Sequence, residues 1–215
     1  MSEINKRLIS SLGIISLLLI SFYNTILLGI LLIFILYQLF YEFLNIFKKI
    51  IDLKKKVKFF LILFATLLYL VSLIILIWLV INDNFGNRSI YLYVIILTCM
   101  STDIGGFLFG KLFKGKKLTK ISPNKTYSGL FGSYILSFVT VYLIFSNSFV
   151  LYELFLYIFF VSTVSQCGDL IVSLLKRKAN LKDTGDLIPG HGGILDRLDG
   201  YIFAIPLGMI TSYLL

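Results

Sequence analysis

Long apolar runs separated by short polar segments dominate the chain, and this pattern predicts an all-α membrane protein. A helix that crosses a bilayer needs about 20 mostly apolar residues, and seven segments reach or approach that length. They are residues 8–22, 25–47, 59–81, 90–110, 129–147, 151–175 and 201–215. We therefore expect a polytopic protein with about seven transmembrane helices, of which the first and last are the shortest. Asn24 and residues 146–150 are expected to form tight turns between neighbouring helices.

The composition excludes a large soluble domain. Of the 215 residues, 58% are hydrophobic and only 14% are charged, whereas soluble domains usually carry about 25% charged residues. We predict an N-terminal region of three spans over residues 1–89. Residues 90–215 would form a catalytic transmembrane region, in which the polar loops 111–128 and 176–200 carry the chemistry.

The basic residues indicate how the helices are oriented. The formal net charge is +9, and 19 of the 20 Lys and Arg residues lie in residues 1–7, 48–58, 111–125 and 176–197. Only Arg88 falls in the alternate set of loops. Cytoplasmic loops are enriched in Lys and Arg, so seven spans with a cytoplasmic N-terminus place these four segments at the inner face of the cytoplasmic membrane. The positive charge is thus explained by topology, and nucleic acid is not an expected partner.

Three carboxylates lie within predicted membrane segments, where an unpaired charge is costly and is by default a candidate for function. Asp103 and Asp169 each lie about two helical turns before the cytoplasmic end of a span, and Glu42 lies near the inner end of the second span. A functional role is favoured for Asp103 and Asp169. For Glu42, an ion pair with a nearby lysine or an interfacial position is favoured.

Asp196 and Asp199 are three residues apart, a spacing that places both side chains on one face of a helix. They would occupy the first turn of the last span, where the helix dipole favours negative charge. Magnesium prefers one or two carboxylates together with water and phosphate oxygens. Asp169, at the end of one span, and Asp196, at the start of the next, could meet across loop 176–195. The sequence therefore predicts a divalent-metal site.

A glycine-rich segment around His191 predicts a phosphate cradle. Gly190, Gly192 and Gly193 allow backbone N–H groups to approach an anion closely. The only histidine of the chain could act as a general base, a hydrogen-bond donor to phosphate or a structural residue. Four cations flank this segment: Lys176, Arg177, Lys182 and Arg197.

A second polar segment, SPNKTYSG at residues 122–129, also suits phosphate. Pro123 fixes a turn, and Lys125, Thr126 and Ser128 place a cation and two hydroxyls directly before a span. For the lysines between Lys111 and Lys120, a role in topology and lipid headgroup contact is favoured.

The segment of residues 173–199 resembles the signature of the phosphatidate cytidylyltransferases, the CDP-diacylglycerol synthases. The resemblance extends to Asp103 with Gly106, to the turn at residues 109–111 and to residues 122–126. Family members usually carry Glu where this chain has Ser128, and many are longer. The signature places are occupied by Ser173, Lys176, Arg177, Lys182, Asp183, Gly185, Pro189, His191, Gly192, Gly193, Asp196, Arg197 and Asp199.

The resemblance implies transfer of CMP from CTP to phosphatidic acid, with release of pyrophosphate, at the bilayer surface. It implies Mg²⁺ on Asp169 and Asp196, with Asp199 supporting a second cation, which could be monovalent, or orienting Arg197. A homodimer remains open. The implied catalytic residues are Asp169, Lys176, Asp183, His191, Asp196, Arg197 and Asp199. The implied substrate-binding residues are Asp103, Ser122, Lys125, Thr126, Ser173, Arg177, Lys182, Gly192 and Gly193.

Two other classes of membrane protein are less consistent with the sequence. A transporter of a small anion would be expected to show internal repeats and interrupted helices near mid-membrane, and the sequence shows neither. An enzyme that transfers alcohols onto CDP-lipids would carry several aspartates on adjacent turns of two helices, whereas this chain has only the Asp196–Asp199 pair.

Overall fold

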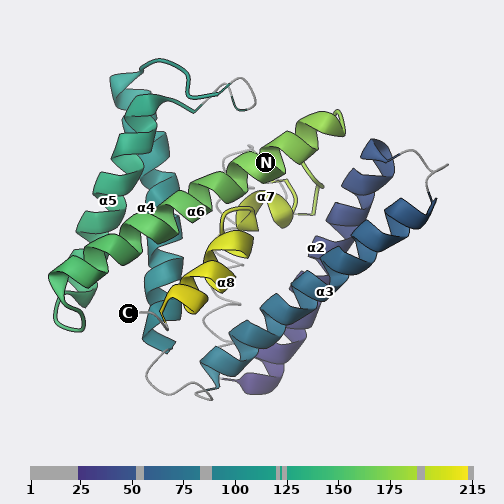
Figure 1. The fold of residues 1–215 in the computed structure, drawn as a ribbon, viewed down its shortest axis with the longest axis horizontal. Helices are drawn as coiled ribbons and strands as arrows, with labels where there is room; N and C mark the ends of the chain where they lie inside the picture. Colours follow the sequence, from purple (N-terminus) through teal and green to yellow (C-terminus); the bar gives the residue numbers. More distant parts are fainter. Residues whose placement is uncertain are drawn as a thin grey trace, which may run out of the picture. The chain divides into compact units, whose positions relative to one another are not determined.

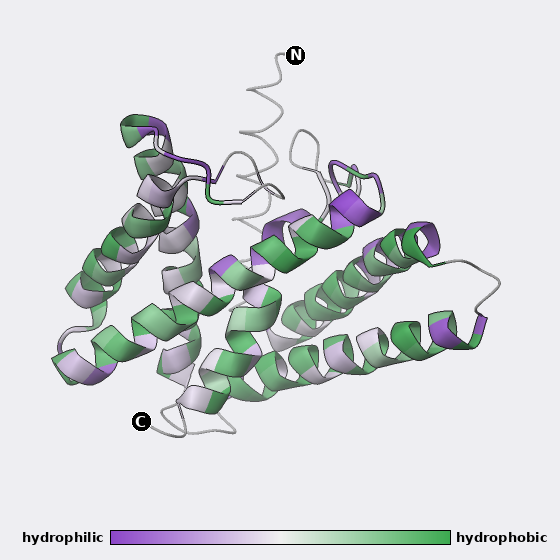
Figure 2. Ribbon diagram, turned by 45° about the horizontal axis from the view of Figure 1, so that its top comes forward, coloured by the Kyte–Doolittle hydropathy of each residue, from purple (hydrophilic) through white to green (hydrophobic). Residues whose placement is uncertain are grey.

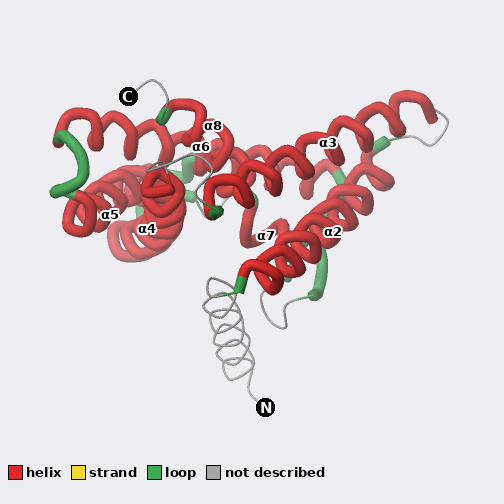
Figure 3. Tube along the Cα trace, turned by 90° about the horizontal axis from the view of Figure 1, so that it is seen from below, coloured by secondary structure: helices red, strands yellow, loops and turns green. Residues whose placement is uncertain are grey.

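Helices joined by loops make up the part of the chain described by the computed structural model, which covers residues 24–51, 56–82, 89–119, 122, 125–187 and 192–212. No strand occurs in these residues (Figure 3). The helices are α2 (Thr25–Ile50), α3 (Lys56–Ile81), α4 (Ser89–Phe113), α5 (Tyr127–Phe145), α6 (Leu151–Lys178), α7 (Leu195–Leu198) and α8 (Tyr201–Thr211) (Figure 1).

Five of these helices, α2 to α6, are long and apolar enough to cross a membrane. Figure 2 shows them mostly in the colour of hydrophobic residues, with hydrophilic residues gathered at helix ends and in loops. The predicted class of polytopic all-α membrane protein is therefore confirmed. The predicted span 8–22 lies outside the described residues. The described part of span 201–215 is the 11-residue helix α8, which contains Pro206; the count of seven spans and the cytoplasmic N-terminus stay predictions.

Two compact units make up the structure, and each contains parts distant in sequence. The first consists of residues 1–78 and 175–198, and the second of residues 79–174 and 199–215. The first unit thus brings α2 and most of α3 together with the loop that follows α6. The second unit contains α4, α5, most of α6 and α8. The predicted boundary between residues 89 and 90 remains a prediction.

In the first unit, local sequence explains where α2 begins and which face it buries. The Asn24 side chain caps the helix by accepting hydrogen bonds from the N–H groups of Ile26 (3.0 Å) and Leu27 (3.2 Å), a role that Asn fills well. Residues spaced three to four apart form the buried face: Leu28, Leu32, Leu39, Phe43 and Ile46. Glu42 lies on this buried face, and the exposed side chains elsewhere on α2 are largely apolar, as expected for contact with lipid.

In the second unit, small residues allow α4 and α5 to pack closely. A Cβ added to Gly105 would lie 2.6 Å from the carbonyl oxygen of Gly132, and one added to Gly129 would lie 2.6 Å from that of Gly106. Such packing is characteristic of helix pairs in membranes. Interhelical hydrogen bonds accompany it, including one from the Ser133 hydroxyl to the carbonyl of Thr102 (2.7 Å). Gly105, Gly106 and Gly129 thus allow the close approach of α4 and α5.

Candidate active site

After α6 the chain reverses direction and enters loop 181–195. Asn180 adopts a left-handed conformation with φ of 54°. The Leu181 N–H bonds to the Lys176 carbonyl at 2.8 Å, and the Asn180 N–H bonds to the Arg177 carbonyl at 3.1 Å. This pattern is a Schellman motif with Asn in place of the usual Gly. Residues 181–187 therefore fold back instead of extending the helix.

Asp196, in the first unit, fixes the loop after α6 through one ion pair and three hydrogen bonds. Its Oδ1 forms an ion pair with Lys176 Nζ at 2.6 Å, and both side chains are largely buried, with exposures of 8% and 12%. Its Oδ2 accepts hydrogen bonds from the N–H groups of Thr184 (2.7 Å) and Gly193 (3.1 Å) and from the Thr184 hydroxyl (3.0 Å). The prediction that Lys176 and Asp196 belong to one cluster is borne out in this geometry.

These contacts also set the charge state of Asp196. Burial opposes ionisation of this carboxyl, but the hydrogen bond from Lys176, the Thr184 N–H, the lysine's charge and the Gly193 N–H together outweigh it. The pKa of Asp196 is consequently lowered below its ordinary value. Asp196 is therefore a carboxylate at neutral pH.

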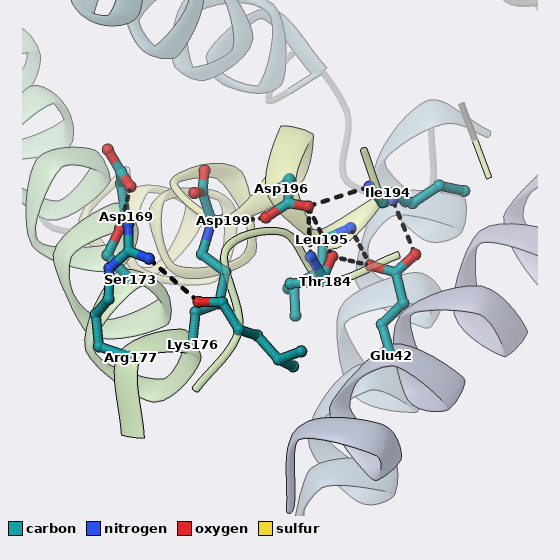
Figure 4. Close-up of polar contacts among 12 residues, drawn as sticks. Glu42, Asp169, Ser173, Lys176, Arg177, Thr184, Ile194, Leu195, Asp196 and Asp199 are labelled. Atoms are coloured by element: carbon teal, nitrogen blue, oxygen red, sulfur yellow. Dashed lines mark hydrogen bonds and ion pairs between the residues drawn. The ribbon is translucent and has the colours of Figure 1, made fainter. Parts of the chain in front are cut away.

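Glu42, on α2, binds the same loop from a position 142 residues earlier in the chain. Its Oε1 accepts from the Ile194 N–H at 2.9 Å, and its Oε2 accepts from the Leu195 N–H at 2.9 Å and from the Thr184 hydroxyl. Figure 4 shows the Glu42 side chain pointing toward these three residues. Glu42 is only 1% exposed, and its partners in the described residues are neutral donors, so the ion pair with a lysine favoured from sequence is not seen there, while an interfacial depth stays a prediction. Its partners are neutral amides and hydroxyls because the loop folds directly over the carboxylate.

Two glycines are required by this arrangement. Gly192 has φ of +82°, a conformation that side chains other than Gly rarely adopt, and a Cβ there would lie 2.9 Å from Asp196 Oδ2. A Cβ on Gly193 would collide with Thr184 Oγ1 and with the Glu42 carboxylate. The loop therefore approaches the carboxylates of Asp196 and Glu42 through backbone atoms, and the phosphate cradle predicted from the glycine-rich sequence stays a prediction. His191 lies outside the described residues.

Asp196 and Asp199 do not share one continuous helix, so that prediction is wrong. Helix α7 ends at Leu198, residues 199–200 form a turn, and α8 begins at Tyr201. The Asp199 Oδ1 accepts a hydrogen bond from the Gly200 N–H at 2.9 Å. Aspartate side chains compete in this way with helical backbone bonds, which explains the break.

In the second unit, Asp169 forms another cluster. Its Oδ2 is ion-paired with Lys125, and its Oδ1 accepts from the Ser173 hydroxyl one turn further along α6 at 3.2 Å (Figure 4). The Asp169 carboxyl also contacts the carboxyl of Asp199. Lys125, Ser173, Asp169 and Asp199 thus come together. The predicted meeting of Asp169 with Asp196 would join the two units and stays a prediction.

The segment before α5 positions Lys125. An isolated bridge pairs Lys117 with Thr126, with the Leu118 N–H bonded to the Lys125 carbonyl at 2.7 Å. The Thr126 hydroxyl caps α5 by accepting from the Gly129 N–H at 3.1 Å, and it lies 3.0 Å from the Ser128 hydroxyl. The Ser122 carbonyl accepts from the Lys125 N–H at 3.1 Å. Thr126 and Ser122 are thereby placed beside Lys125, as the sequence suggests.

The remaining predicted site residues lie at exposed positions. Arg177 donates to the Leu181 carbonyl at 3.2 Å, which helps to close the turn after α6. Lys182 and Asp183 are exposed on that turn, and Arg197 is exposed on α7. Asp103 is exposed on α4. Accessible cations on the loop suit contact with a bound polyanion.

The donor chemistry of these carboxylates can be compared with what a magnesium ion requires. In the described ranges, no group of three or more His, Cys, Asp or Glu side chains is arranged to hold a metal ion. Asp169 and Asp199 form a contacting pair of carboxyls, and Asp169 is also ion-paired with Lys125. A pair fits Mg²⁺, which takes one or two carboxylates and fills its remaining positions with water and phosphate. In the first unit, both carboxylate oxygens of Asp196 already have partners: Oδ1 is ion-paired with Lys176, and Oδ2 accepts three hydrogen bonds.

Comparison with known proteins agrees with this geometry. The cytidylyltransferase family profile matches residues 2–215. The chain belongs to the cytidylyltransferase family. The predicted resemblance is confirmed, and the cluster around Asp196 is formed by residues of the family signature.

Similar members of the family are called phosphatidate cytidylyltransferase. The chain is 38% identical over 128 residues to that of Bacillus subtilis, covering 58% of this chain and 47% of the relative. It is 40% identical over 121 residues to that of Staphylococcus saprophyticus, covering 54% and 46%. For Rickettsia felis the values are 38% over 149 residues, 61% and 62%. The matched part thus spans about half to three fifths of these family members.

Sequence reasoning undervalued two residues of the site, Glu42 and Thr184. Thr184 is buried and bridges Glu42 and Asp196, yet it occupies a variable place of the signature. The sequence offered one indication: Glu42 is a carboxylate within a predicted span, and such a carboxylate requires hydrogen-bond or ion-pair partners. Nothing in the sequence indicated that those partners lie in loop 181–195.

Proposed function

We propose that this member of the cytidylyltransferase family transfers CMP from CTP to phosphatidic acid, giving CDP-diacylglycerol and pyrophosphate. One observation carries the proposal. Charged residues near the polar end of the apolar helix α6 form ion pairs: its Lys176 with Asp196 in the first unit, and its Asp169 with Lys125 in the second. A lipid phosphate and a water-soluble nucleotide can meet only at such a boundary between hydrocarbon and water.

The reaction joins two polyanions, so positioning and charge compensation account for most of the barrier. A phosphate oxygen of the lipid forms a bond to the α-phosphorus of CTP. The bond from that phosphorus to the bridging oxygen of the β-phosphate breaks, and the electron pair leaves with pyrophosphate. The lipid phosphate is already ionised at neutral pH and requires little base assistance.

The chain supplies groups for each part of this reaction. Arg177, Lys182 and Arg197 are exposed cations that would compensate the charge on the triphosphate and the departing pyrophosphate. The glycine-rich loop would bind phosphate oxygens through N–H groups other than those of Gly193, Ile194 and Leu195, which bond to Asp196 and Glu42. Lys125, held beside Asp169, would bind the lipid phosphate. His191 is assigned to phosphate binding because no base is needed.

Magnesium is the proposed cofactor, held by Asp169 and Asp199. The resemblance implies Asp196 as a further ligand, which would have to exchange its ion pair with Lys176 for the metal, and it implies a second cation, which could be monovalent. When bound, Mg²⁺ would act as a Lewis acid on the triphosphate. The distribution of Lys and Arg supports an active site on the cytoplasmic face of the inner membrane.

The test is CMP transfer by the purified full chain in lipid nanodiscs that contain phosphatidic acid. CTP labelled at the α-phosphorus should give organic-soluble label when Mg²⁺ is present, and CTP labelled at the γ-phosphorus should give labelled pyrophosphate. Asp169→Asn should lower the rate by at least about 100-fold, the cost of removing one preorganised charge-stabilising group.

Asp186→Asn is the control, since Asp186 is an exposed carboxylate in the loop after α6 and occupies a variable place of the signature. This variant should transfer CMP at the wild-type rate. The proposal fails if the wild-type chain forms no lipid-linked label, or if Asp169→Asn is as active as Asp186→Asn. Uptake of a small anion into proteoliposomes without CMP transfer would favour the transporter.

A further inference from the structure

We propose that Glu42 is a positioning residue that fixes the glycine-rich segment 192–196 and, through Thr184, the carboxylate of Asp196. The proposal deepens the proposed function and rests on it. It assigns to α2, outside the signature, a part in binding the nucleotide phosphates.

The hydrogen bonds of Glu42 are unusually complete for a carboxylate on a membrane helix. Oε1 accepts from Gln38 Nε2 at 3.1 Å and from the Ile194 N–H, and Oε2 accepts from the Leu195 N–H and the Thr184 hydroxyl. Four donors on two oxygens provide the compensation that a buried carboxylate needs. A residue needed only for packing would be apolar here, as its neighbours Leu39, Phe43 and Ile46 are.

Thr184 connects Glu42 to Asp196. Its hydroxyl oxygen is within hydrogen-bond distance of Glu42 Oε2 and of Asp196 Oδ2. A hydroxyl carries one proton, so the two carboxylates share it, and a shift of either changes the bond available to the other. The Thr184 N–H bonds to Asp196 as well. The position of Asp196 is therefore coupled to that of Glu42.

The same carboxylate orients the backbone that follows Gly193. Ile194 and Leu195 direct their N–H groups to Glu42, while Gly193 directs its N–H to Asp196. Three consecutive amides are thus held by two carboxylates. The Glu42 side chain lies so close to Gly193 that a Cβ there would meet its carboxylate. Little freedom remains for the segment, which is the preorganisation that phosphoryl transfer requires.

The first experiment compares Glu42→Gln with the matched control Glu153→Gln, a glutamate in the first turn of α6. In Glu42→Gln, an amide nitrogen replaces one of the two carboxylate oxygens. This nitrogen is a donor and faces the donors of Thr184, Ile194 or Leu195, so the hydrogen bonds to that atom are lost. We expect kcat/KM for CTP to fall about 10- to 100-fold, as for residues that orient a reacting group. The KM for phosphatidic acid should stay close to that of Glu153→Gln. Hydrogen exchange of the peptide containing Ile194 and Leu195 should become faster in Glu42→Gln alone.

Thr184 provides a second pair of variants that keeps the test decisive if Glu42→Gln does not fold. Thr184→Ser retains the hydroxyl and should keep most of the activity, whereas Thr184→Val loses it and should show the CTP defect. In a double variant, Glu42→Gln should add less to Thr184→Val than it costs alone, because both break the link through Thr184 and only Glu42→Gln also disturbs the Ile194 and Leu195 amides.

Two results would overturn the inference. One is a folded Glu42→Gln protein with the exchange and kinetic constants of Glu153→Gln, and the other is equal activity of Thr184→Val and Thr184→Ser. If the wild-type chain transfers no CMP, the proposed function fails on its own. Unchanged exchange at Ile194 and Leu195 in Glu42→Gln would then separately remove the role of Glu42.

Discussion

Replacing Gly193 by Ala probes the fit between the signature loop and Glu42. The new methyl group would overlap Thr184 Oγ1 and one oxygen of Glu42, and would lie 2.7 Å from the Glu42 carboxyl carbon. Overfilling a packed site costs about 1–3 kcal/mol, and disturbing a hydrogen bond to a charged group costs about 1.5–3 kcal/mol. We therefore expect a loss of about 3–5 kcal/mol in the free energy of unfolding.

Gly185→Ala is the matched control for this substitution. A Cβ at Gly185 would lie 3.4 Å from Glu42 Oε1, which is an ordinary contact, so its cost should stay below about 1 kcal/mol. At about 2–4 °C per kcal/mol for a chain of this size, Gly193→Ala should lower Tm by roughly 10 °C more than Gly185→Ala in detergent. Equal Tm values for the two variants would refute the reasoning about the loop.

Two further predictions follow from the ion pair and from the helix packing. Because the folded-state pKa of Asp196 is depressed, its contribution to stability is complete above its unfolded pKa of about 3.9 and is lost as the pH falls through the lower folded value. Thermal unfolding between about pH 5 and pH 2 should therefore show a shallower acid loss in Asp196→Asn than in wild type; parallel curves would contradict the assignment. Gly105→Ala should destabilise the second unit by about 1–3 kcal/mol, because its methyl group would meet the Gly132 carbonyl. Gly115→Ala, whose nearest atom is the Ser128 hydroxyl at 3.2 Å, should have a much smaller effect on Tm.

The sequence predicted helix positions well but placed several ends too early. The span expected at 151–175 continues to Lys178, and the one expected at 25–47 continues to Ile50. The apolar pattern stops where Lys176 or Lys48 begins, yet the helices continue because lysine stems remain on the apolar surface while their charges reach water. Hydropathy marks the hydrocarbon boundary and not the last helical hydrogen bond.

The site was predictable where local sequence carries the chemistry. The cluster of Lys176, Gly193 and Asp196 follows from the signature, whereas the ion pair of Lys125 with Asp169 was not predicted, because the sequence suggested phosphate as the partner of Lys125. The break at Asp199 and the role of Glu42 were not predictable. The first depends on a side-chain bond to one backbone N–H, and the second depends on a contact between residues 142 positions apart.

The central claim is that the aspartates of the signature region hold a divalent cation that binds the nucleotide. Binding of Mn²⁺ in place of Mg²⁺ tests it most directly, measured by electron paramagnetic resonance on the purified chain with CTP. We predict one Mn²⁺ bound per chain in the wild type and in Asp186→Asn, and a large loss of binding in Asp169→Asn and Asp199→Asn. Equal Mn²⁺ binding by all four proteins would contradict the claim.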